Sequence, residues 1–302
     1  MAFDTSAMTA HSELISDKLI AKAIANSATA NMLIQSQNYQ SGVKSSATIL
    51  KLSADITVQL GDSCDRNPLG NSVFTDEKIF VTPLRVNENV CAKSFYNTVL
   101  QSKVSKGQND EVIDDSVIFA VTEKKIKGIA SFNEKLLWNG DTALAGSNPL
   151  HYFDGIRKQV KTGGTALVLP TGTTLTMDLK LKEAFLKTNI DIRHDEDFFI
   201  FISEQVYDEY LAALSAKQIT QPVDSTRVFG TSAKFAVVPG LNGVNEIYLG
   251  KLENLQMATD GEDDSESVQI KPNPIGSSMF MDFNWSLGIK VIYPEEFAYL
   301  VL

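Results

Sequence analysis

The sequence predicts an α+β fold in which strands, one long helix and a mixed segment follow one another in separate blocks. Alternating apolar and polar residues fill residues 45–88, and strand patterns return after Thr226. Between them lie a long helical pattern and a segment where helices flank a buried strand. With 302 residues, of which 43% are hydrophobic, the chain is long enough for about two domains of ~100–200 residues each.

Residues 1–44 are predicted to form an N-terminal arm. They are polar and rich in Ala, Ser, Asn and Gln. One helical stripe, formed by Leu14, Ile15, Lys18, Leu19, Lys22 and Ala23, carries too little apolar surface to hold a core. We therefore expect the arm to pack on something else.

Residues 45–88 are predicted to form a long β-hairpin. The stretch ATILKLSADITVQL alternates, GDSCDRNPLGN supplies turn residues, and SVFTDEKIFVTPLRV alternates again. Arms of about 10 residues would reach over ~30 Å. Since an isolated two-stranded hairpin is marginal in water, its expected partner is another subunit.

A long helix is predicted over residues 110–139, within a domain spanning residues 89–149. Asn109 can cap it, Asp110 and Glu111 suit its first turn, and Gly140 follows its end. Apolar residues mark one face, namely Ile118, Val121, Ile129, Phe132 and Leu136. At ~1.5 Å per residue it would be about 45 Å long.

The turn-rich link GDTALAGSNPLHYFDG is a plausible domain boundary. Residues 150–251 read as an α/β segment, with helices at FDGIRKQV, TMDLKLKEAFLKTN and EQVYDEYLAALSAK and a buried strand at DFFIFIS. Ser203 is the expected N-cap of the last helix. KTGGTALVLPTGTT reads as a flexible loop, and residues 252–302 are mostly predicted strands, among them ESVQIKP, SMFMDFNWSLGIKVIYP and FAYLVL.

Composition excludes several classes of protein. The formal net charge of −10 argues against a surface that grips many phosphates. No apolar run is long enough for a transmembrane helix, and residues 1–18 do not form a signal peptide, so the expected location is the cytosol. Cys64 and Cys91 cannot form a CxxC pair, and buried thiols are favoured over a disulfide.

The sequence offers weak candidates for chemistry. His11, His151 and His194 fall in three different regions, so each is expected to be a lone surface histidine. The acidic loop of Asp260, Glu262, Asp263, Asp264 and Glu266 lacks the glycine and the final glutamate of a calcium loop. His194, Asp195, Glu196 and Asp197 are adjacent, so their side chains diverge. No phosphate-binding loop or nucleophile elbow occurs. We therefore predict no catalytic, cofactor or metal site, and no enzyme.

Several stretches are similar to tailed-bacteriophage major capsid proteins of the Hong Kong 97-type fold. They are LRVNENVCAK, NEKLLWNGD, FDG and the C-terminal run from VVPGLNGVNEIYLGKLENLQMATD to MFMDFNWSLGIKVIYPEEFAYLVL. The order of parts is also similar, and the short motifs resemble those in capsid proteins of phages that infect Bacteroidetes. The resemblance spans nearly the whole chain.

The resemblance implies a role for each segment. Residues 1–44 would be the arm, residues 45–88 an extended loop lying across an adjacent subunit, and residues 110–139 the spine helix of a peripheral domain over residues 89–149. Residues 150–251 would be the axial domain, and residues 252–302 the strands that complete the peripheral sheet and the C-terminal return.

The resemblance also implies partners. Pentamers and hexamers of the chain would form an icosahedral shell around packaged double-stranded DNA, with no membrane. A separate scaffolding protein and a portal would be partners, and decoration proteins are a further candidate. Some members crosslink subunits through Lys and Asn. Lys51 and Lys78 lie in the ribbon, but no crosslink is predicted from them.

Two other functions remain open at this stage. An encapsulin-like nanocompartment shell shares the fold but tends to have a shorter ribbon. A metal-dependent hydrolase would use the IRHDED stretch and the acidic loop. The size of the assembled particle and its contents separate the three.

Overall fold

A computed structural model gives the fold of the chain and describes residues 27–54, 57–58, 70–91, 115–169, 175–217, 226–260, 268–272 and 278–302. In these residues two five-stranded sheets and a separate two-stranded ribbon combine with helices, which is an α+β arrangement. No helix in the described ranges is long and apolar enough to cross a membrane.

The first sheet is built around one long strand, β11 (Ser278–Val291). Its first ten residues run antiparallel to β4 (Thr82–Cys91), and the same part of β11 pairs with β10 (Val268–Pro272). The end of β11 pairs with β9 (Leu255–Ala258), which also takes up the short parallel strand β1 (Tyr39–Gln40). A single strand therefore joins most of this sheet.

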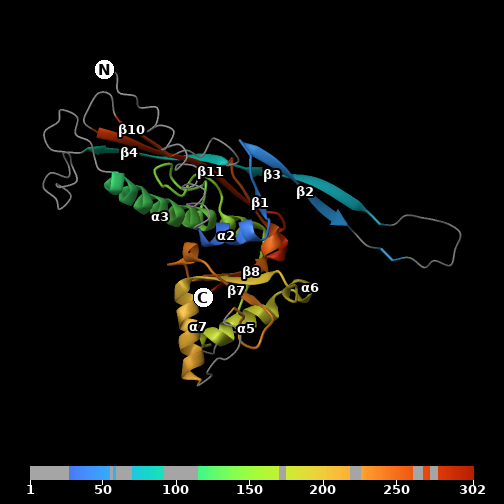
Figure 1. Cartoon of the computed structure of the whole chain (residues 1–302). Helices are drawn as coiled ribbons and strands as arrows, with labels where there is room; N and C mark the ends of the chain where they lie inside the picture. Colours follow the sequence, from blue (N-terminus) through green and yellow to red (C-terminus); the bar gives the residue numbers. More distant parts are fainter. Residues whose placement is uncertain are drawn as a thin grey trace, which may run out of the picture.

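Two helices pack against the first sheet. The long helix α3 (Asp115–Asn139) lies beneath β4, β10 and β11, and the short helix α2 (Ala28–Gln35) packs beside it (Figure 1). The inward side chains of α3 and β11 form one buried cluster that includes Ile129, Leu136, Phe283, Trp285 and Leu287. Burial of this apolar surface fixes the helix on the sheet.

The second sheet has the strand order β5–β12–β8–β6–β7. Its strands are β5 (Thr165–Leu167), β6 (Phe198–Ile202), β7 (Lys234–Val237), β8 (Glu246–Lys251) and β12 (Ala298–Val301). Around it lie α4 (Ile156–Gly163), α5 (Met177–Lys187), α6 (Ile190–Arg193) and α7 (Glu204–Ala216). The Ser203 hydroxyl accepts a hydrogen bond from the Val206 N–H, so the predicted N-cap of α7 is confirmed.

The two halves share a continuous core. Trp138, near the end of α3, is fully buried, and its ring packs against Phe201 of β6 and Tyr248 of β8 with centroid distances of 5.4 and 5.7 Å. Three short 3-10 helices complete the described chain, namely η3 (Pro239–Leu241), η4 (Leu252–Asn254) and η5 (Pro294–Glu296). The segment that contains η5 carries the chain from the first sheet to β12 of the second.

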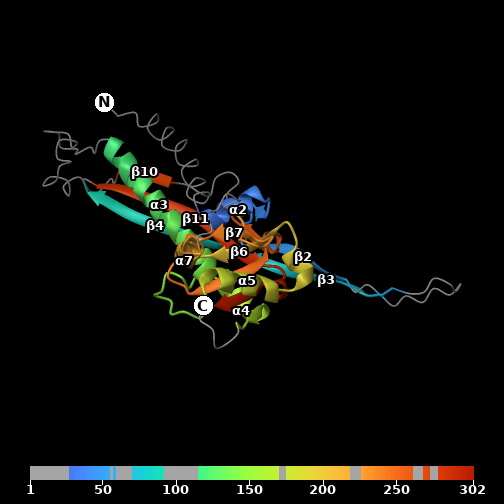
Figure 2. The same cartoon turned by 90° about the horizontal axis from the view of Figure 1, so that it is seen from below.

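The ribbon consists of β2 (Ser46–Ala54) and β3 (Ser72–Phe80), which pair antiparallel over nine residues. It extends away from the rest of the molecule in both views (Figures 1 and 2). The predicted hairpin is confirmed for these arms but not for its full range of 45–88. Residues from Thr82 onward belong to β4, because joining β11 buries Leu84 on the first sheet.

Three other expectations need correction or fall outside the described residues. Residues 28–40 are part of the body, since Ala30 and Leu33 of α2 are buried against the core; residues 1–26 of the predicted arm are not described. Not all of residues 252–302 complete the first sheet, because β12 pairs with β8 and β5. The long helix ends at Asn139 as predicted, while its predicted start at residues 109–114 is not described.

Several short elements were not predicted. The strands β1, β5 and β9 have two to four residues: β1 falls in the predicted arm, β5 in the predicted flexible loop, and β9 in the mostly β region but outside the strands named there. In the predicted flexible loop KTGGTALVLPTGTT, residues 165–167 form β5, which pairs parallel with β12, and residues 170–174 lie outside the description. The stretch CAKSFYNTVLQSK, residues 91–103, has a pattern that predicts a short helix; Cys91 instead ends β4, and the rest of the stretch lies outside the described residues.

Candidate assembly surfaces

The ribbon carries an exposed apolar face. Because side chains alternate along a strand, the register places Leu50, Leu52, Phe74 and Phe80 on one face, with Leu52 directly opposite Phe74. Their side chains are 60, 45, 62 and 65% exposed. Scattered apolar residues on a surface are ordinary, but four large ones aligned on a two-stranded ribbon indicate a contact surface.

The opposite face of the ribbon is directed toward its own chain. Ile79 is buried there in a small cluster with Val43, Val81 and Ala258, and Ala47 and Ile49 pack against it. Gly288 of β11 approaches the same point so closely that an added Cβ would lie 2.1 Å from the Phe80 carbonyl oxygen. The inner face thus fixes the root of the ribbon on the body and leaves the outer face uncovered by these contacts.

Polar contacts extend this attachment farther along the inner face. The Lys51 ammonium lies 2.7 Å from a Glu295 carboxylate oxygen and 4.8 Å from the centroid of the Tyr293 ring. The Tyr293 hydroxyl accepts a hydrogen bond from the Leu52 N–H and donates one to its carbonyl oxygen, both at 3.2 Å. Lys290 pairs with Glu77 at 3.1 Å. Partial burial raises the pKa of Glu295, but the Lys51 ammonium outweighs this effect, and the pKa lies below its ordinary value.

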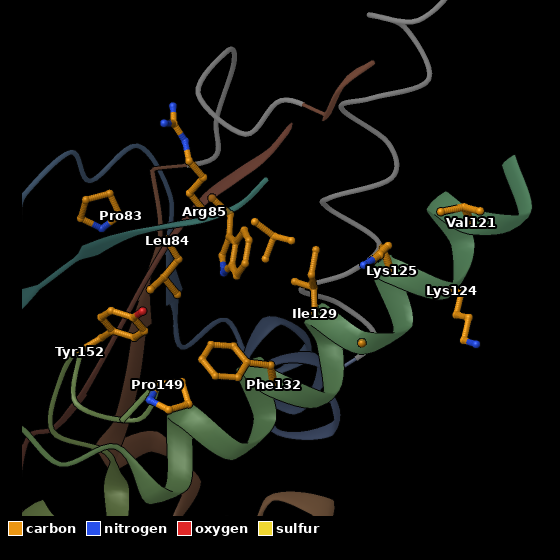
Figure 3. A pocket seen from close by; sticks show the side chains of 13 residues that line it. Pro83, Leu84, Arg85, Val121, Lys124, Lys125, Ile129, Phe132, Pro149 and Tyr152 are labelled. Carbon is orange, nitrogen blue, oxygen red and sulfur yellow. The ribbon is translucent and has the colours of Figure 1, made fainter. Parts of the chain in front are cut away.

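A groove of about 800 Å³ opens between α3 and β4 (Figure 3). Leu84, Ile129 and Trp285 form its buried apolar floor, and Phe132 adds to it. Arg85, Lys124 and Lys125 stand at its edges, where Arg85 donates a hydrogen bond to Asn284 at 2.7 Å and Lys125 pairs with Glu88. In Figure 3, Ile129 and Phe132 point from α3 into this space, while Lys124 points away from it. The groove is a second apolar surface that the described chain leaves open.

The histidines do not come together. His151 lies in the loop before α4, where its ring stacks on Tyr152 at 4.6 Å and its Nδ1 lies 2.6 Å from the Asn148 carbonyl oxygen. His194 caps the end of α6 and packs edge-on against Phe185. His11 lies outside the described residues.

The acidic candidates are drawn into separate contacts. Asp195 pairs with Lys251 at 2.5 Å, whereas an oxygen of Asp197 accepts a hydrogen bond from the Glu253 N–H at 2.7 Å. Glu196 is exposed, and Asp260 is half-buried after β9. The other acidic-loop residues, 262 to 266, are not described. Within the described ranges, no group of three or more His, Cys, Asp or Glu residues could hold a metal ion.

The ribbon lysines occupy different faces. Lys51 is engaged on the inner face with Glu295, whereas Lys78 is exposed on the outer face opposite Thr48. Cys91 is half-buried at the end of β4, and Cys64 lies outside the description.

Sequence reasoning missed two buried carboxylates. Glu134 of α3 is 3% exposed and accepts hydrogen bonds from the Ser27 hydroxyl, the Thr29 N–H at 3.0 Å and the Thr29 hydroxyl at 2.6 Å. The Trp138 indole N–H donates to that same Thr29 oxygen at 2.7 Å. Glu134 therefore caps α2 from another helix. In the sequence Glu134 is one of two glutamates among the lysines of α3, and nothing in the pattern signals this role.

The second carboxylate, Glu246, begins β8 and joins it to α4. Arg157 and Lys161 of α4 lie 2.9 and 2.6 Å from its oxygens, and the Tyr248 hydroxyl donates to it at 2.5 Å. Burial raises the pKa of Glu246, but the hydrogen bonds from Lys161 and Tyr248 and the charge of Arg157 outweigh it, so the pKa lies below its usual value. The cluster is satisfied internally and serves packing.

Comparison with known proteins shows the fold. No family model and no curated protein matches the sequence. Among solved structures, a chain of the satellite phage P4 procapsid with the size determination (Sid) protein is 13% identical with a TM-score of 0.58, covering 94% of this chain and 89% of that one. A chain of Gordonia phage Cozz is 10% identical with a TM-score of 0.58, covering 89% and 86%. A chain of the capsid of Myoviridae phage XM1 is 14% identical with a TM-score of 0.53, covering 89% and 90%.

These structural neighbours define a class. The chain has the mixed α+β fold of subunits found in phage capsids. At identities of 10–14% the likeness establishes the fold, and the function has to be argued from the surfaces described above.

Proposed function

We propose that the chain is the major capsid protein of a tailed bacteriophage and that it assembles through its ribbon into a closed shell. The observation that carries the proposal is the outer face of the ribbon, where Leu50, Leu52, Phe74 and Phe80 lie exposed on a hairpin that extends away from its own core. Burying a side chain of this size contributes about 1.5–3 kcal/mol. A second copy of the chain supplies the cover.

The contact is heterologous, because the ribbon face of one copy meets a different surface of the next. Such contacts generate rings when the rotation closes, as pentamers and hexamers require. The open groove beside α3 offers a further apolar surface that neighbouring copies cover in the same assembly. The net charge of −10 fits a shell that encloses double-stranded DNA without holding it tightly.

The finer assignments follow from this role. Residues 1–44, 45–88, 89–149, 150–251 and 252–302 correspond to arm, extended loop, peripheral domain, axial domain and C-terminal return, except that residues 28–40, β4 and β12 are placed as described above. The shell is of the Hong Kong 97 type, in the virion of a phage related to those of Bacteroidetes, and it uses a separate scaffolding protein and a portal. The chain has no enzymatic function and no cofactor.

Electron microscopy of the expressed protein tests the proposal. Shells, tubes or capsomer rings are the expected products. A monomer or small oligomer with stoichiometric metal would contradict it in favour of a hydrolase, and shells that contain a cargo enzyme would support a nanocompartment instead.

Two substitutions and a matched control test the role of the ribbon's outer face. Phe74→Ser and Leu50→Ser remove apolar groups from the outer face, whereas Thr48→Ser on the same face removes one methyl group. We expect the first two to raise the protein concentration needed for assembly about tenfold or more each, since ~1.4 kcal/mol is a factor of ten. The unfolding free energy of the unassembled subunit should stay within about 0.5 kcal/mol of the parent. Assembly that is equal in all three variants would refute a role for this face.

A further inference from the structure

One short segment contacts both the ribbon and the part of the body built around the second sheet. Tyr293 and η5 follow β11 and precede β12, so the segment of residues 293–297 joins the two sheets. On one side it meets the ribbon through Tyr293 and Glu295. On the other side it is packed against α4, β8 and the loop before β9.

These other contacts hold the segment firmly. Pro294 lies so close to Gly163 at the end of α4 that an added Cβ there would be 2.7 Å from the proline ring. The Phe297 ring lies on Gly250 of β8 with similarly little space and packs against Phe201 at 6.5 Å. Glu296 accepts a hydrogen bond from the Asn254 side chain at 2.6 Å. A segment fixed by buried apolar contacts can serve as an anchor for the ribbon of the same chain.

The ribbon needs such an anchor because its own ladder does not orient it. The nine cross-strand pairs of β2 and β3 hold the arms to each other, but they leave the angle to the body undefined. Near Ile79 the apolar cluster fixes the root. Glu77 of the inner face pairs with Lys290 at 3.1 Å, and farther out Lys51 and Leu52 contact Glu295 and Tyr293.

The Tyr293 contact is geometrically demanding. The Tyr293 hydroxyl forms hydrogen bonds with both the N–H and the carbonyl oxygen of Leu52. It thus satisfies the two backbone groups that a neighbouring strand would otherwise pair with. The same ring lies under the Lys51 ammonium, which in turn reaches Glu295. The contacts therefore restrain both the height and the tilt of the ribbon above η5.

We propose that Tyr293 and Glu295 are positioning residues that set the angle at which the ribbon leaves the body, and that they couple this angle to the packing between the two sheets. The proposal deepens the proposed function, on which its meaning for assembly rests. A ribbon presented at one angle reaches a neighbouring subunit in one orientation. Without the contacts of Tyr293 and Glu295, the ribbon would meet neighbours at several angles, and the assemblies would be heterogeneous.

The angle is measured within one chain. Spin labels at Ala54 on the ribbon and Ser131 on the exposed face of α3, with Cys64 and Cys91 replaced by Ser, give a distance distribution by double electron–electron resonance. Labelled protein diluted into unlabelled protein ensures that each distance lies within one subunit, whether or not shells form. We expect one narrow distribution in the parent.

The variants separate positioning from general stability. Tyr293→Phe removes both hydrogen bonds to Leu52 but keeps the ring, and Glu295→Gln removes the charge that Lys51 meets. Glu253→Gln is the matched control, because it removes an exposed carboxylate that pairs with Lys251 at 3.5 Å, away from the ribbon. We expect the first two to broaden the distribution at least twofold and the control to leave it unchanged.

Exchanging the charges of Lys51 and Glu295 tests whether the distance distribution can be restored. Lys51→Glu and Glu295→Lys should each broaden the distribution, and the double variant should narrow it again, which a merely destabilising change would not do. Unchanged widths in Tyr293→Phe and Glu295→Gln would overturn the proposal. If the parent formed no shells, the proposed function would fail while the distance measurement still decided the positioning role.

Discussion

At the scale of single residues, a buried carboxylate fastens the first described helix to the body. Three donors from Ser27 and Thr29 converge on Glu134, and Trp138 completes the chain of hydrogen bonds through the Thr29 hydroxyl. A helix terminus has unpaired N–H groups, and here a distant side chain satisfies them. The N-terminal end of α2 is thus held to the body by one side chain of α3.

Glu134→Gln should detach this end of α2. The amide NH₂ group would face donors where an oxygen now accepts, so we expect a loss of about 1–3 kcal/mol in unfolding free energy. Hydrogen exchange across residues 28–35 should accelerate. Glu123→Gln on the same helix removes an exposed charge that pairs with Lys127 at 3.0 Å and should cost no more than about 0.5 kcal/mol. Equal losses in chemical denaturation would argue against the capping role.

Residue roles were predictable where the pattern is local. Ser203 was recognised as an N-cap because the helix it opens follows directly in the sequence. The donors to Glu134 and the two cations that meet Glu246 lie more than 80 residues away, so both carboxylates resemble ordinary surface charges in the sequence. Buried charges become visible only when the fold brings their partners together.

At the scale of elements, the root of the ribbon depends on a glycine in the long strand. Gly288 lets β11 pass directly beneath the Phe80 carbonyl, at the residue where β3 ends and the chain turns into β4. Any side chain there must displace backbone atoms.

Gly288→Ala should therefore destabilise the subunit by about 1–3 kcal/mol through overpacking. Gly128→Ala is the matched control, because its added Cβ meets nothing within 4 Å on α3. That substitution should stabilise the helix by about 0.5–1 kcal/mol. Thermal unfolding of the two variants should shift in opposite directions, and a shift in the same direction would show that the close approach at Gly288 is relaxed without cost.

The predictability of the elements follows their length. The ribbon arms and the helices α4, α5 and α7 span at least eight residues, which is enough for a period to appear. The missed strands β1, β5 and β9 have only two to four residues and are not set off by a pattern in the sequence. The break at Val81 was missed because the alternation continues through it, and only pairing with β11 decides that β4 leaves the ribbon.

At the scale of the whole molecule, the cluster around Glu246 joins the two halves. Arg157 reaches both Glu246 at the start of β8 and Asn139 at the end of α3, so the second sheet is tied to the helix that packs on the first. Asn139 also donates to the Gly240 carbonyl at 2.6 Å. Together with Trp138, these contacts favour a single cooperative unfolding transition.

The pH dependence of the unfolding free energy in Glu246→Gln should reveal the contribution of this cluster. Because the folded pKa of Glu246 is lowered, its stabilisation is present above the unfolded pKa of about 4.3 and is lost as the pH falls through the folded value. We expect the variant to lose about 2–3 kcal/mol at pH 7, below the usual loss for a broken buried pair because the two cations keep some water. The difference from the parent should shrink below about pH 4. Parallel stability curves down to pH 2.5 would refute the assignment.

Sheet membership was the least predictable feature of the molecule. The pattern of FAYLVL indicated a strand correctly, but its place beside β8 and β5 depends on contacts more than 40 residues away in sequence. The same holds for residues 28–40, which look like a thin arm in sequence and become core when α3 and β9 are beside them.

The ten-residue ladder between β4 and β11 has a mechanical consequence. A pull along these strands would load their hydrogen bonds in shear, so that many must fail together. In a shell of the proposed kind, stretching by internal pressure would therefore be resisted by the first sheet.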